Sequence, residues 1–488
     1  MSLNKRGADE KRGADETAEL PARRDMKTAI IGGGISGLAL AYLLKGQCPG
    51  ADLTIYEELA RPGGKIWTER HNGFLLEGGV NGFLNNRPKT LEFAASLGLM
   101  PLRSSDRARI RYVFSKGRLN RIPEGVLDFF QSNLLSVPGR ARIVLETIAR
   151  RSSSTDETLS EFATRRLGRE AYETLIDPMA SGIYAGDSTL LSLKSCFPKI
   201  YNLEAKYGGL IVGMLKMKWA ARDTGKSVSA GPGGILTSFQ DGMGALIDAL
   251  AAKLGSALVN NSRVTAIEKT ANKYHIHFKD APTEEVDIVV LAAPAHAAAD
   301  ILYALDKNLS LQLAKIPYPY VTVVSMAFKR EAVKSDFDGF GFLIPYKEGR
   351  KILGTLCDSN TFGGRAPEGY MLFRTMLGGA RAGGVAALDD EKIIDTVFSE
   401  LSDIIKIKGT PEMVKIFRHE KAIPQYNKGH AALLGGINES LKAHDGLFLH
   451  GNSYTGISVN DCIEQSYPLA YSLGNLIMGK SKGLDIKS

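Results

Sequence analysis

The sequence predicts an α/β protein, α+β overall, with a discontinuous parallel-sheet domain, a helical domain and an antiparallel sheet. In KTAIIGGG an apolar strand runs into a glycine turn, and an apolar helix and a second strand follow, which is a β-α-β unit. Helical patterns prevail at about 115–220, and alternating strands such as YVTVVSMAFKR come later. A strand, turn and helix return in LFLHGNSYTGISVNDCI, so separated segments are expected to share one domain.

Length and composition fit a globular protein of two or three domains. The chain has 488 residues, of which 44% are hydrophobic, enough for a large core. A net charge of +8 can favour anionic partners, but no nucleic-acid motif is present, so no nucleic-acid partner is expected. The four cysteines form no C-x-x-C pair and the eight histidines show no ligand spacing, so neither a disulfide framework nor a metal site is predicted.

The beginning of the chain predicts a disordered tail at residues 1–25, which are polar and repeat KRGADE. We find no apolar signal segment and no apolar run long enough to span a bilayer, so a cytoplasmic protein is expected. Peripheral membrane attachment stays open because Pro138–Arg151 is basic and amphipathic. A helix packed on its own core is the alternative interpretation of that segment.

The first glycine turn carries a dinucleotide signature. Gly32, Gly34 and Gly37 fit G-x-G-x-x-G between a strand and a helix, where glycines permit a tight turn and close approach to a pyrophosphate. The helix start would face the phosphates with its partial positive charge. Glu57 follows 20 residues later, where an acid can bond ribose hydroxyls, and Glu58 is the neighbouring alternative. The predicted contacts of this turn also include Ile35 and Ser36.

The segment after the acid favours FAD over NAD. Arg61 can donate to a phosphate, and the pair Gly63–Gly64 lets backbone approach the second half of a dinucleotide. This R-x-G-G extension resembles that of the flavin amine oxidase superfamily. Lys65 follows the pair and is assigned to the same cofactor site.

The late turn is predicted to complete this site. Its helix would direct a positive dipole end at the flavin and stabilise the reduced form, with Asn460 or Asp461 as the cap. The residues assigned to the cofactor here are Gly451, Asn452, Ser458 and Val459.

Further segments resemble the porphyrinogen oxidase family of FAD enzymes. These segments are GFLLEGGVNGFL, Leu175–Met214, SFQDGMGALIDAL, GFGFLIPYKEGRKILGTLCDSNTFGGRAPEGY and AIPQYNKGH, in family order over about 26–480. The resemblance implies a Rossmann-like FAD-binding domain, an antiparallel-sheet substrate domain and a helical membrane-associating domain. Their expected ranges are 26–100, 229–300 and 441–482 for FAD, 101–115 and 301–440 for substrate, and 116–228 for the helices.

The resemblance also implies an activity: oxidation of protoporphyrinogen IX to protoporphyrin IX in heme biosynthesis. Six electrons would leave in three hydride transfers to flavin N5, and dioxygen or a quinone would reoxidise the flavin. We assign no catalytic base, because the protein mainly positions the substrate. The implied substrate contacts are Arg111, Phe362, Leu343 and Gly182, and further FAD contacts are Val264 and Ala292.

Several alternatives remain open at the level of sequence. The substrate could be coproporphyrinogen III, which has four propionates instead of two. An amine oxidase or a carotenoid desaturase shares the first and last glycine turns, and a non-enzymatic flavin or tetrapyrrole carrier is a third class. The oligomeric state is also open, a homodimer included.

Overall fold

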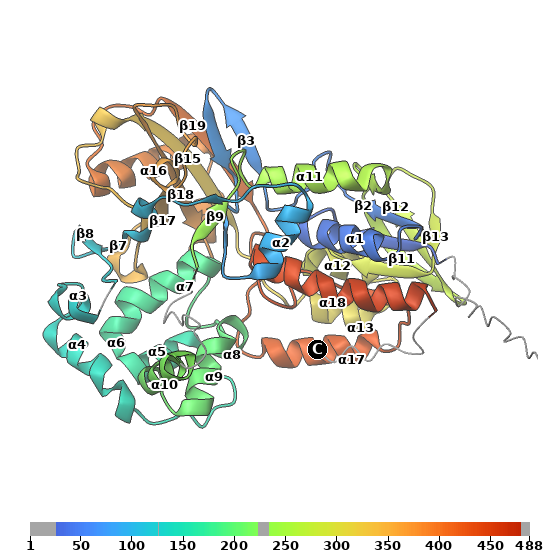
Figure 1. The fold of residues 1–488 in the computed structure, drawn as a ribbon, viewed down its shortest axis with the longest axis horizontal. Helices are drawn as coiled ribbons and strands as arrows, with labels where there is room; N and C mark the ends of the chain where they lie inside the picture. The colour runs from blue at the N-terminus through green and yellow to red at the C-terminus, as the bar shows by residue number, and fades with distance from the viewer. Residues whose placement is uncertain (1–25, 125, 223–233, 480–488) are drawn as a thin grey trace, which may run out of the picture.

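The computed structural model describes residues 26–124, 126–222 and 234–479 (Figure 1). The predicted tail 1–25, the predicted domain boundary at 228 and residues 480–482 lie outside this range. The described chain contains two large sheets, several small ones and a cluster of helices.

A five-stranded parallel sheet forms the centre of the first domain, in the order β10-β2-β1-β14-β20. Its strands come from three separated segments of the chain, as the fold class required. That predicted class, α/β with a discontinuous parallel sheet, is confirmed. The strands are β1 (Thr28–Ile31), β2 (Leu53–Tyr56), β10 (Leu258–Val259), β14 (Ile288–Leu291) and β20 (Leu447–Leu449).

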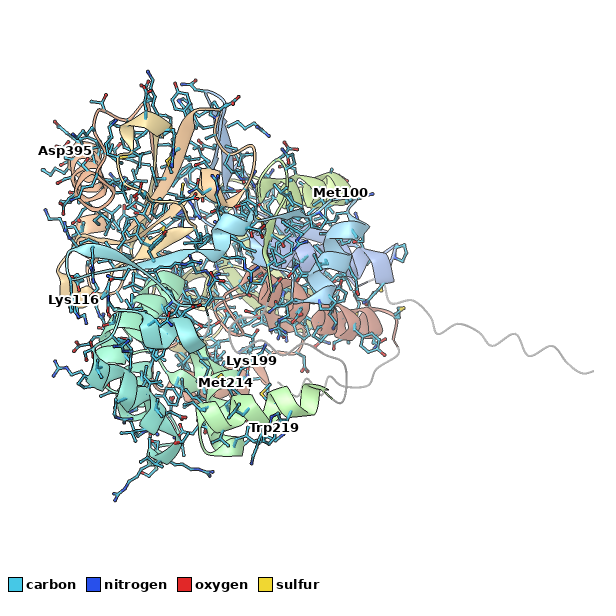
Figure 2. The ribbon with its side chains drawn as sticks, turned by 60° about the vertical axis from the view of Figure 1, so that its left-hand side comes forward. Met100, Lys116, Lys199, Met214, Trp219 and Asp395 are labelled. Carbon is cyan, nitrogen blue, oxygen red and sulfur yellow. The ribbon has the colours of Figure 1, made fainter. Side chains whose placement is uncertain are left out.

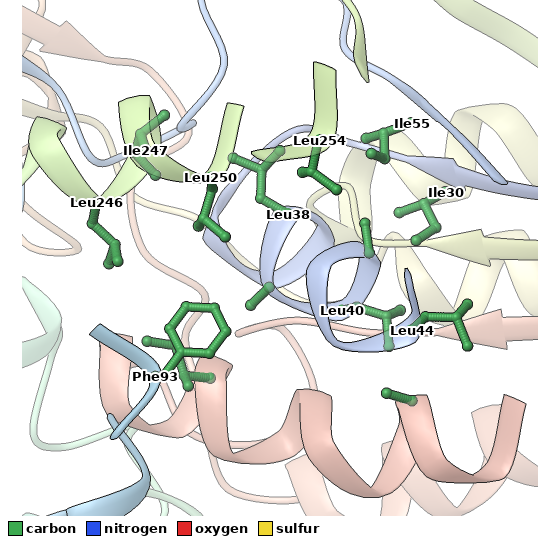
Figure 3. Close-up of a cluster of buried hydrophobic side chains, with 14 of the residues drawn as sticks. Ile30, Leu38, Leu40, Leu44, Ile55, Phe93, Leu246, Ile247, Leu250 and Leu254 are labelled. Atoms are coloured by element: carbon green, nitrogen blue, oxygen red, sulfur yellow. The ribbon is translucent and has the colours of Figure 1, made fainter. Parts of the chain in front are cut away.

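Helices cover both faces of this sheet, because its strands are apolar on both sides. Ile30 points into a cluster with α1, α11 and α18 (Figure 3), while Ala29 and Ile31 point into a second cluster with α12, α13 and α17. These helices are α1 (Ile35–Gln47), α2 (Pro88–Ser96), α11 (Gly244–Leu254), α12 (Ala295–Leu302), α13 (Lys307–Leu313), α17 (His430–Leu441) and α18 (Val459–Ile477).

Two of these helices fall in the range 301–440 that the sequence assigned to the substrate domain. Leu309 and Leu313 of α13 and Ile437 of α17 are buried in the same cluster as the strands of the parallel sheet. The chain therefore crosses between the two domains more often than the predicted ranges allow.

A seven-stranded mixed sheet, in the order β19-β15-β18-β17-β16-β7-β8, forms the second domain. All neighbours are antiparallel except β16 and β7. Helix α16 (Asp390–Ile405) packs on one face. The strands are β7 (Arg111–Ser115), β8 (Arg118–Arg121), β15 (Val321–Lys329), β16 (Gly341–Leu343), β17 (Ile352–Cys357), β18 (Tyr370–Gly378) and β19 (Met413–His419).

Strand β8 lies within the range 116–228 that was predicted to be helical. It pairs with β7 through a tight turn at Lys116 and Gly117, which both have positive φ angles of 56° and 74°. The lysine-glycine pair was the turn signal that the sequence analysis did not use.

Smaller elements join the two large sheets. A hairpin of β3 and β4 and two three-stranded sheets, β5-β9-β6 and β11-β12-β13, flank the first domain. Their strands are β3 (Thr68–His71), β4 (Phe74–Glu77), β5 (Phe83–Leu84), β6 (Leu102–Arg103), β9 (Leu236–Ser238), β11 (Val264–Thr270), β12 (Lys273–Phe278) and β13 (Glu284–Val286). The short helices α14 (Asp358–Thr361) and α15 (Gly383–Ala386) follow β17 and β18.

The helical domain is a cluster of short helices below the second sheet (Figure 1). None of the described helices is long and apolar enough to cross a membrane. The helices are α3 (Val126–Gln131), α4 (Val137–Val144), α5 (Leu159–Leu167), α6 (Arg169–Ala171), α7 (Asp177–Tyr184), α8 (Leu193–Cys196), α9 (Pro198–Tyr207) and α10 (Leu210–Arg222).

The predicted amphipathic helix Pro138–Arg151 is broken in the structure. Helix α4 ends at Val144, and Leu145–Ile148 forms a 3₁₀ turn. The reason is Glu146, which turns inward and accepts hydrogen bonds from the N–H groups of Leu210 and Ile211 at 2.8 and 3.1 Å. A carboxylate at this place stabilises the N-terminus of α10.

Buried charges hold the helical domain together. Arg166 is fully buried and pairs with Glu146 and Glu204, and it also donates to the carbonyl of Gly208 at the end of α9. Burial alone would raise the pKa of Glu204, but hydrogen bonds from Arg165 and Arg166 lower it below 4.5. Glu204 therefore stabilises the fold above about pH 4.5, and this stabilisation is lost as the pH falls below that value.

We expect Arg166→Leu to lower the free energy of unfolding by about 3–5 kcal/mol, because the buried Glu146 loses its charged partner and Glu204 keeps only Arg165. Urea unfolding followed by circular dichroism measures this. Arg169→Leu is the matched control, since Arg169 pairs with Glu173 on the surface and should be dispensable. Equal stability of the two variants would contradict the assignment.

Candidate active site

The first turn has the tight geometry that its glycines predict. Gly32 has a φ of +112°, and a Cβ there would lie 2.8 Å from the backbone nitrogen of Ala293. A Cβ on Gly37 would lie 2.1 Å from the carbonyl oxygen of Gly32. Both positions therefore require glycine, because side chains would collide with backbone.

Gly34 has free space at its Cβ position, whereas Gly32 and Gly37 are tightly packed. No protein atom lies within 4 Å of the place that its Cβ would take. Helix α1 begins at the next residue, Ile35, and has no side-chain cap, so Ile35 and the buried Ser36 present their N–H groups at an uncapped terminus. This terminus and the open glycine form a cradle that suits a pyrophosphate.

The structure distinguishes between the two candidate acids. Glu57 is buried, and its Oε2 accepts from the N–H of Gly33 at 2.7 Å while its Oε1 accepts from that of Leu59 at 3.0 Å. Burial raises the pKa of Glu57, against these two hydrogen bonds. Glu58 is exposed and lies 4.0 Å from Arg263. Glu57 is therefore the acid placed beside the turn.

The Arg61 side chain stabilises the loop in which it lies. Its guanidinium donates to the carbonyls of Pro62, Gly64 and Ile66 at 3.1, 3.1 and 2.9 Å and lies 4.7 Å from the ring centre of Trp67. The predicted contact with a phosphate would therefore use the N–H groups of Arg61 that do not bond these carbonyls.

The loop that Arg61 holds is placed against the first turn. The N–H of Gly63 donates to the carbonyl of Gly33 at 2.7 Å, and a Cβ on Gly64 would lie 3.4 Å from the Cα of Gly34. The two predicted glycine motifs are thus adjacent.

Lys65 brings an unpaired positive charge to this region. Its ammonium forms no ion pair among the ranges that the structure describes, and burial lowers its pKa. It also helps to lower the pKa values of His296 and His419, after the larger effect of burial on both. An anionic ligand would relieve this accumulation of positive charge.

The late turn lies against the first one. Strand β20 pairs with β14, and Gly451 follows with a φ of +122°. A Cβ on Gly451 would lie 3.5 Å from Oγ of Ser36 and 3.8 Å from the carbonyl oxygen of Ala292. The backbone oxygen of the next residue, Asn452, accepts from the hydroxyl of Tyr426 at 2.5 Å. Residues from three parts of the chain therefore meet at one end of the parallel sheet.

The predicted cap of the last helix was wrong. Helix α18 begins at Val459 and is capped by Ser458, whose Oγ accepts from the N–H of Asp461 at 3.1 Å. Asp461 in return accepts from the N–H of Ser458 at 3.2 Å, which completes a capping box. Asn460 instead donates to the carbonyl of Leu84 at 2.9 Å.

Val264 lies at the other end of the site. It is buried at the start of β11, and the N–H of Ser262 just before it donates to the carbonyl of Glu57 at 2.8 Å. The segment therefore runs beside the acid that would bind the ribose.

Two of the predicted substrate residues are in contact. A Cβ on Gly182 of α7 would lie 2.7 Å from Cδ2 of Leu343 in β16. Arg111 stands on the neighbouring strand β7, exposed, with its guanidinium 5.5 Å from the ring centre of Phe340.

Phe362 is buried, unlike a side chain that lines an open cavity. It is 1% exposed, and the guanidinium of Arg365 lies 5.1 Å from its ring centre. Its predicted stacking on a pyrrole ring would need the opposite ring face, so this contact remains a prediction.

Sequence analysis missed a buried group between the two domains. Arg374 of β18 donates from Nε to Asp358 at 3.0 Å and from Nη1 to the carbonyl of Gly79 at 2.7 Å. No local pattern marks this trio, because the pairing depends on the register of β17 and β18 and on the docking of the first domain.

A cavity of about 440 Å³ lies elsewhere, between the helical domain and the loops after β16 and β18. Arg381 there already pairs with Asp177 and Asp187 at 2.8 and 2.6 Å, so its charges are satisfied. The cavity is lined by Tyr172, Glu173, Asp177, Asp187, Thr189, Tyr346, Lys347, Ala380 and Arg381, none of which was predicted for the site.

The chain belongs to the flavin-containing amine oxidoreductase family, whose model matches residues 35–470. It is 32% identical to the chloroplastic protoporphyrinogen oxidase of Oryza sativa subsp. japonica, over 95% of this chain and 91% of the relative. It is 31% identical to the coproporphyrinogen III oxidase of Bacillus subtilis (strain 168), over 89% of this chain and 95% of the relative. The predicted resemblance to porphyrinogen oxidases is confirmed by these matches.

A solved structure shares the fold. The chain from Exiguobacterium sp. 255-15, named provisionally as a protoporphyrinogen oxidase, matches with a TM-score of 0.80 at 24% identity and covers 93% of this chain and 99% of its own. The family and the two relatives named above show that the protein is an FAD-dependent oxidoreductase, as predicted. The open, uncapped helix start at Gly34 suits the phosphates of FAD, Glu57 suits a ribose hydroxyl, and the ammonium of Lys65 suits an anionic group of the cofactor.

We expect Gly34→Ala to weaken FAD binding by about tenfold or more while the apoprotein keeps its stability, because the added methyl meets only the cofactor. Titration of the apoprotein with FAD and thermal unfolding measure the two quantities. Gly46→Ala, near the far end of the helix that follows Gly34 and equally open, is the matched control and should bind FAD normally. Unchanged FAD affinity in the Gly34 variant would contradict the assignment of the cradle.

Proposed function

We propose that this protein oxidises protoporphyrinogen IX to protoporphyrin IX. The observation that carries the proposal is Arg111 at the edge of an apolar sheet face, in a chain whose relatives are named as porphyrinogen oxidases. FAD supplies the acceptor for hydride from a meso carbon of the substrate. The protein's own residues then have to bind and orient the tetrapyrrole and exclude water.

The sheet face is suited to a flat apolar ligand. Because β7 and β16 are parallel and in register, the side chains of Arg111, Val113 and Leu343 share one face, with Gly341 opposite Arg111. Gly182 of α7 faces Leu343. Aliphatic side chains are suited to contact an apolar macrocycle, and the guanidinium at the edge can bond a propionate.

Four exposed arginines lie near this edge of the sheet. Two acids pair with three of them at 2.8–3.9 Å and balance two of the four positive charges, although Arg121, opposite Tyr112 in the register, is on the other face from Arg111. The arginines are Arg107, Arg109, Arg111 and Arg121, and the acids are Glu124 and Asp338.

Farther along the same row of the sheet the positive charges are paired, since Lys415 of β19 lies 2.8 Å from Glu69. Arg374 lies three strands away from Arg111, roughly 14 Å at ordinary strand spacing, and Asp358 neutralises it. A substrate with its carboxylates on one side fits this distribution better than one with four propionates around the ring. This favours protoporphyrinogen IX over coproporphyrinogen III.

Anaerobic mixing of the FAD-loaded protein with each porphyrinogen tests the proposal. We expect protoporphyrinogen IX to bleach the flavin absorbance and produce porphyrin fluorescence, and coproporphyrinogen III to react with lower kcat/KM. Arg111→Ala should raise KM with a smaller change in kcat, since it removes binding common to ground and transition state. Arg118→Ala, an exposed arginine on β8, is the control. Absence of bleaching by both substrates would exclude the function.

We further propose that the helical domain contacts a membrane surface peripherally. Exposed apolar side chains project from the turn after α4, where Ile148 is 76% exposed, and from the neighbouring α10. Trp219 of α10 is 66% exposed and is labelled in Figure 2. Arg150 and Arg151 follow Ile148 in the chain and are exposed. Aliphatic and tryptophan side chains next to basic ones are typical of proteins that lie on anionic bilayers.

The double variant Ile148→Asp/Trp219→Asp should no longer float with vesicles of phosphatidylcholine and phosphatidylglycerol, while the wild type does. Met100→Asp is the control, because Met100 is 84% exposed but lies after α2 on the FAD domain (Figure 2). Both variants should bind FAD normally. Flotation of the double variant at the wild-type level would refute membrane contact through this surface.

A further inference from the structure

We infer that Arg374 is a positioning residue for the oxidation reaction, because it fixes the backbone of Gly78–Asn81 against the seven-stranded sheet of the second domain (the substrate sheet). This inference rests on the proposed function for its activity measurement. Its structural basis is a buried set of charges at the contact between the two domains.

Arg374 is placed to bridge the domains. It lies in the middle of β18, is 3% exposed, and points to the sheet face that the first domain covers. Asp358, 2% exposed, follows β17 and accepts from its Nε at 3.0 Å. The bond from Nη1 to the carbonyl of Gly79, at 2.7 Å, crosses from the second domain to the first. The ion pair thus orients a donor toward one backbone oxygen.

The strand before this oxygen is anchored from both sides. Glu77 is buried and accepts from Oγ1 of Thr68 at 2.6 Å and from the N–H of Met243 at 2.8 Å. Burial raises the pKa of Glu77 to about 7, against these hydrogen bonds and the charges of Arg374 and Arg365.

Arg365 completes the set. It donates to the carbonyl oxygens of Phe239 and Gln240 at 2.9 and 3.1 Å and to Oγ of Ser238 at 3.1 Å, so it also joins the two domains.

The backbone at Gly78 and Gly79 is tightly packed, so it cannot move without displacing its neighbours. A Cβ on Gly78 would lie 2.6 Å from the ring of Phe417, and one on Gly79 would lie 2.3 Å from the carbonyl oxygen of Lys65. The segment is therefore enclosed between the substrate sheet and the loop assigned to FAD. A displacement at Arg374 would pass through Gly79 to that loop.

Three polar atoms beside this segment have no hydrogen-bond partner among the described residues. They are Nδ2 of Asn81, Oδ1 of Asp358 and Oγ of Ser325, and all three are buried. Ser325 is directly opposite Arg374 in the sheet register. Buried polar atoms normally have partners, so their grouping marks a place where polar atoms of the cofactor or the substrate belong.

The expected effect follows from geometry. A misplacement of about 1 Å in a group that positions reactants can slow a reaction by roughly a hundredfold. Loss of the Arg374 bond would free Gly79 and allow Asn81 to move, although neither the FAD cradle nor Arg111 is altered. The rate of flavin reduction should fall while KM changes little.

A purely stabilising role predicts a different result, and a pair of variants separates the two. Arg374→Leu leaves Asp358 buried without its partner and should be destabilised. Arg374→Leu/Asp358→Leu removes both charges, and apolar replacement of a buried ion pair is often close to neutral for stability. If Arg374 only stabilises the fold, the double variant recovers both its melting temperature and its rate.

The experiment measures the melting temperature, FAD affinity, the flavin absorption spectrum and the anaerobic rate of flavin bleaching by protoporphyrinogen IX. We expect the double variant to regain most of the melting temperature but to bleach about 10- to 100-fold more slowly, with a shifted flavin spectrum. Arg350→Leu is the control, because Arg350 pairs with Glu400 and Asp403 of α16 and should leave rate and spectrum unchanged.

A wild-type rate in the double variant would overturn the inference. If the double variant does not fold, Arg374→Lys decides, because lysine keeps the charge but cannot bond Asp358 and Gly79 in the same two directions. It should fold and react slowly, and a wild-type rate would again refute the inference. If no porphyrinogen reduces the flavin of the wild type, the proposed function fails, whereas the flavin spectra of the variants still test Arg374.

Discussion

The fold depends on one contact, the packing of Gly32 beneath the end of β14. No side chain fits there, because Ala292 and Ala293 pass within 3 Å of the place that a Cβ would take. This closeness aligns β1 with β14, and β14 in turn aligns β20, whose continuation brings Gly451 beside Ser36. The cofactor cradle is therefore a property of three aligned strands, and the helices on both faces serve to keep them aligned.

The second domain is attached through a similar close approach. Gly78 meets the ring of Phe417 and Gly79 meets Arg374, so glycine backbone from the first domain lies directly on the substrate sheet. Side chains at these positions would push the sheets apart and separate the cofactor from the tetrapyrrole. In both places glycine, which has no side chain, lets two elements of the structure approach closely.

Much of this arrangement could be predicted from sequence because its signals are local. The glycine turn, the acid at the end of β2 and the late strand-turn-helix each depend on a few neighbouring residues, and the structure brings them together. The predictions failed where distant residues decide. Glu146 breaks the expected helix after α4 because it bonds Arg166 and α10, and Arg374 finds Asp358 and Gly79 only after two sheets have formed. The misplaced cap at α18 is a smaller error of local reading, since Ser458 was available two residues earlier.

The position of β20 in the chain has a consequence for biosynthesis. During translation β1 and β2 emerge early, but their outer neighbours β14 and β10 follow only after the helical domain, and β20 follows only after the whole seven-stranded sheet. A nascent chain therefore carries the first glycine turn without the late turn that packs against it. The parallel sheet is complete only when the last segment has left the ribosome, and until then the apolar faces of β1 and β2 lack part of their packing.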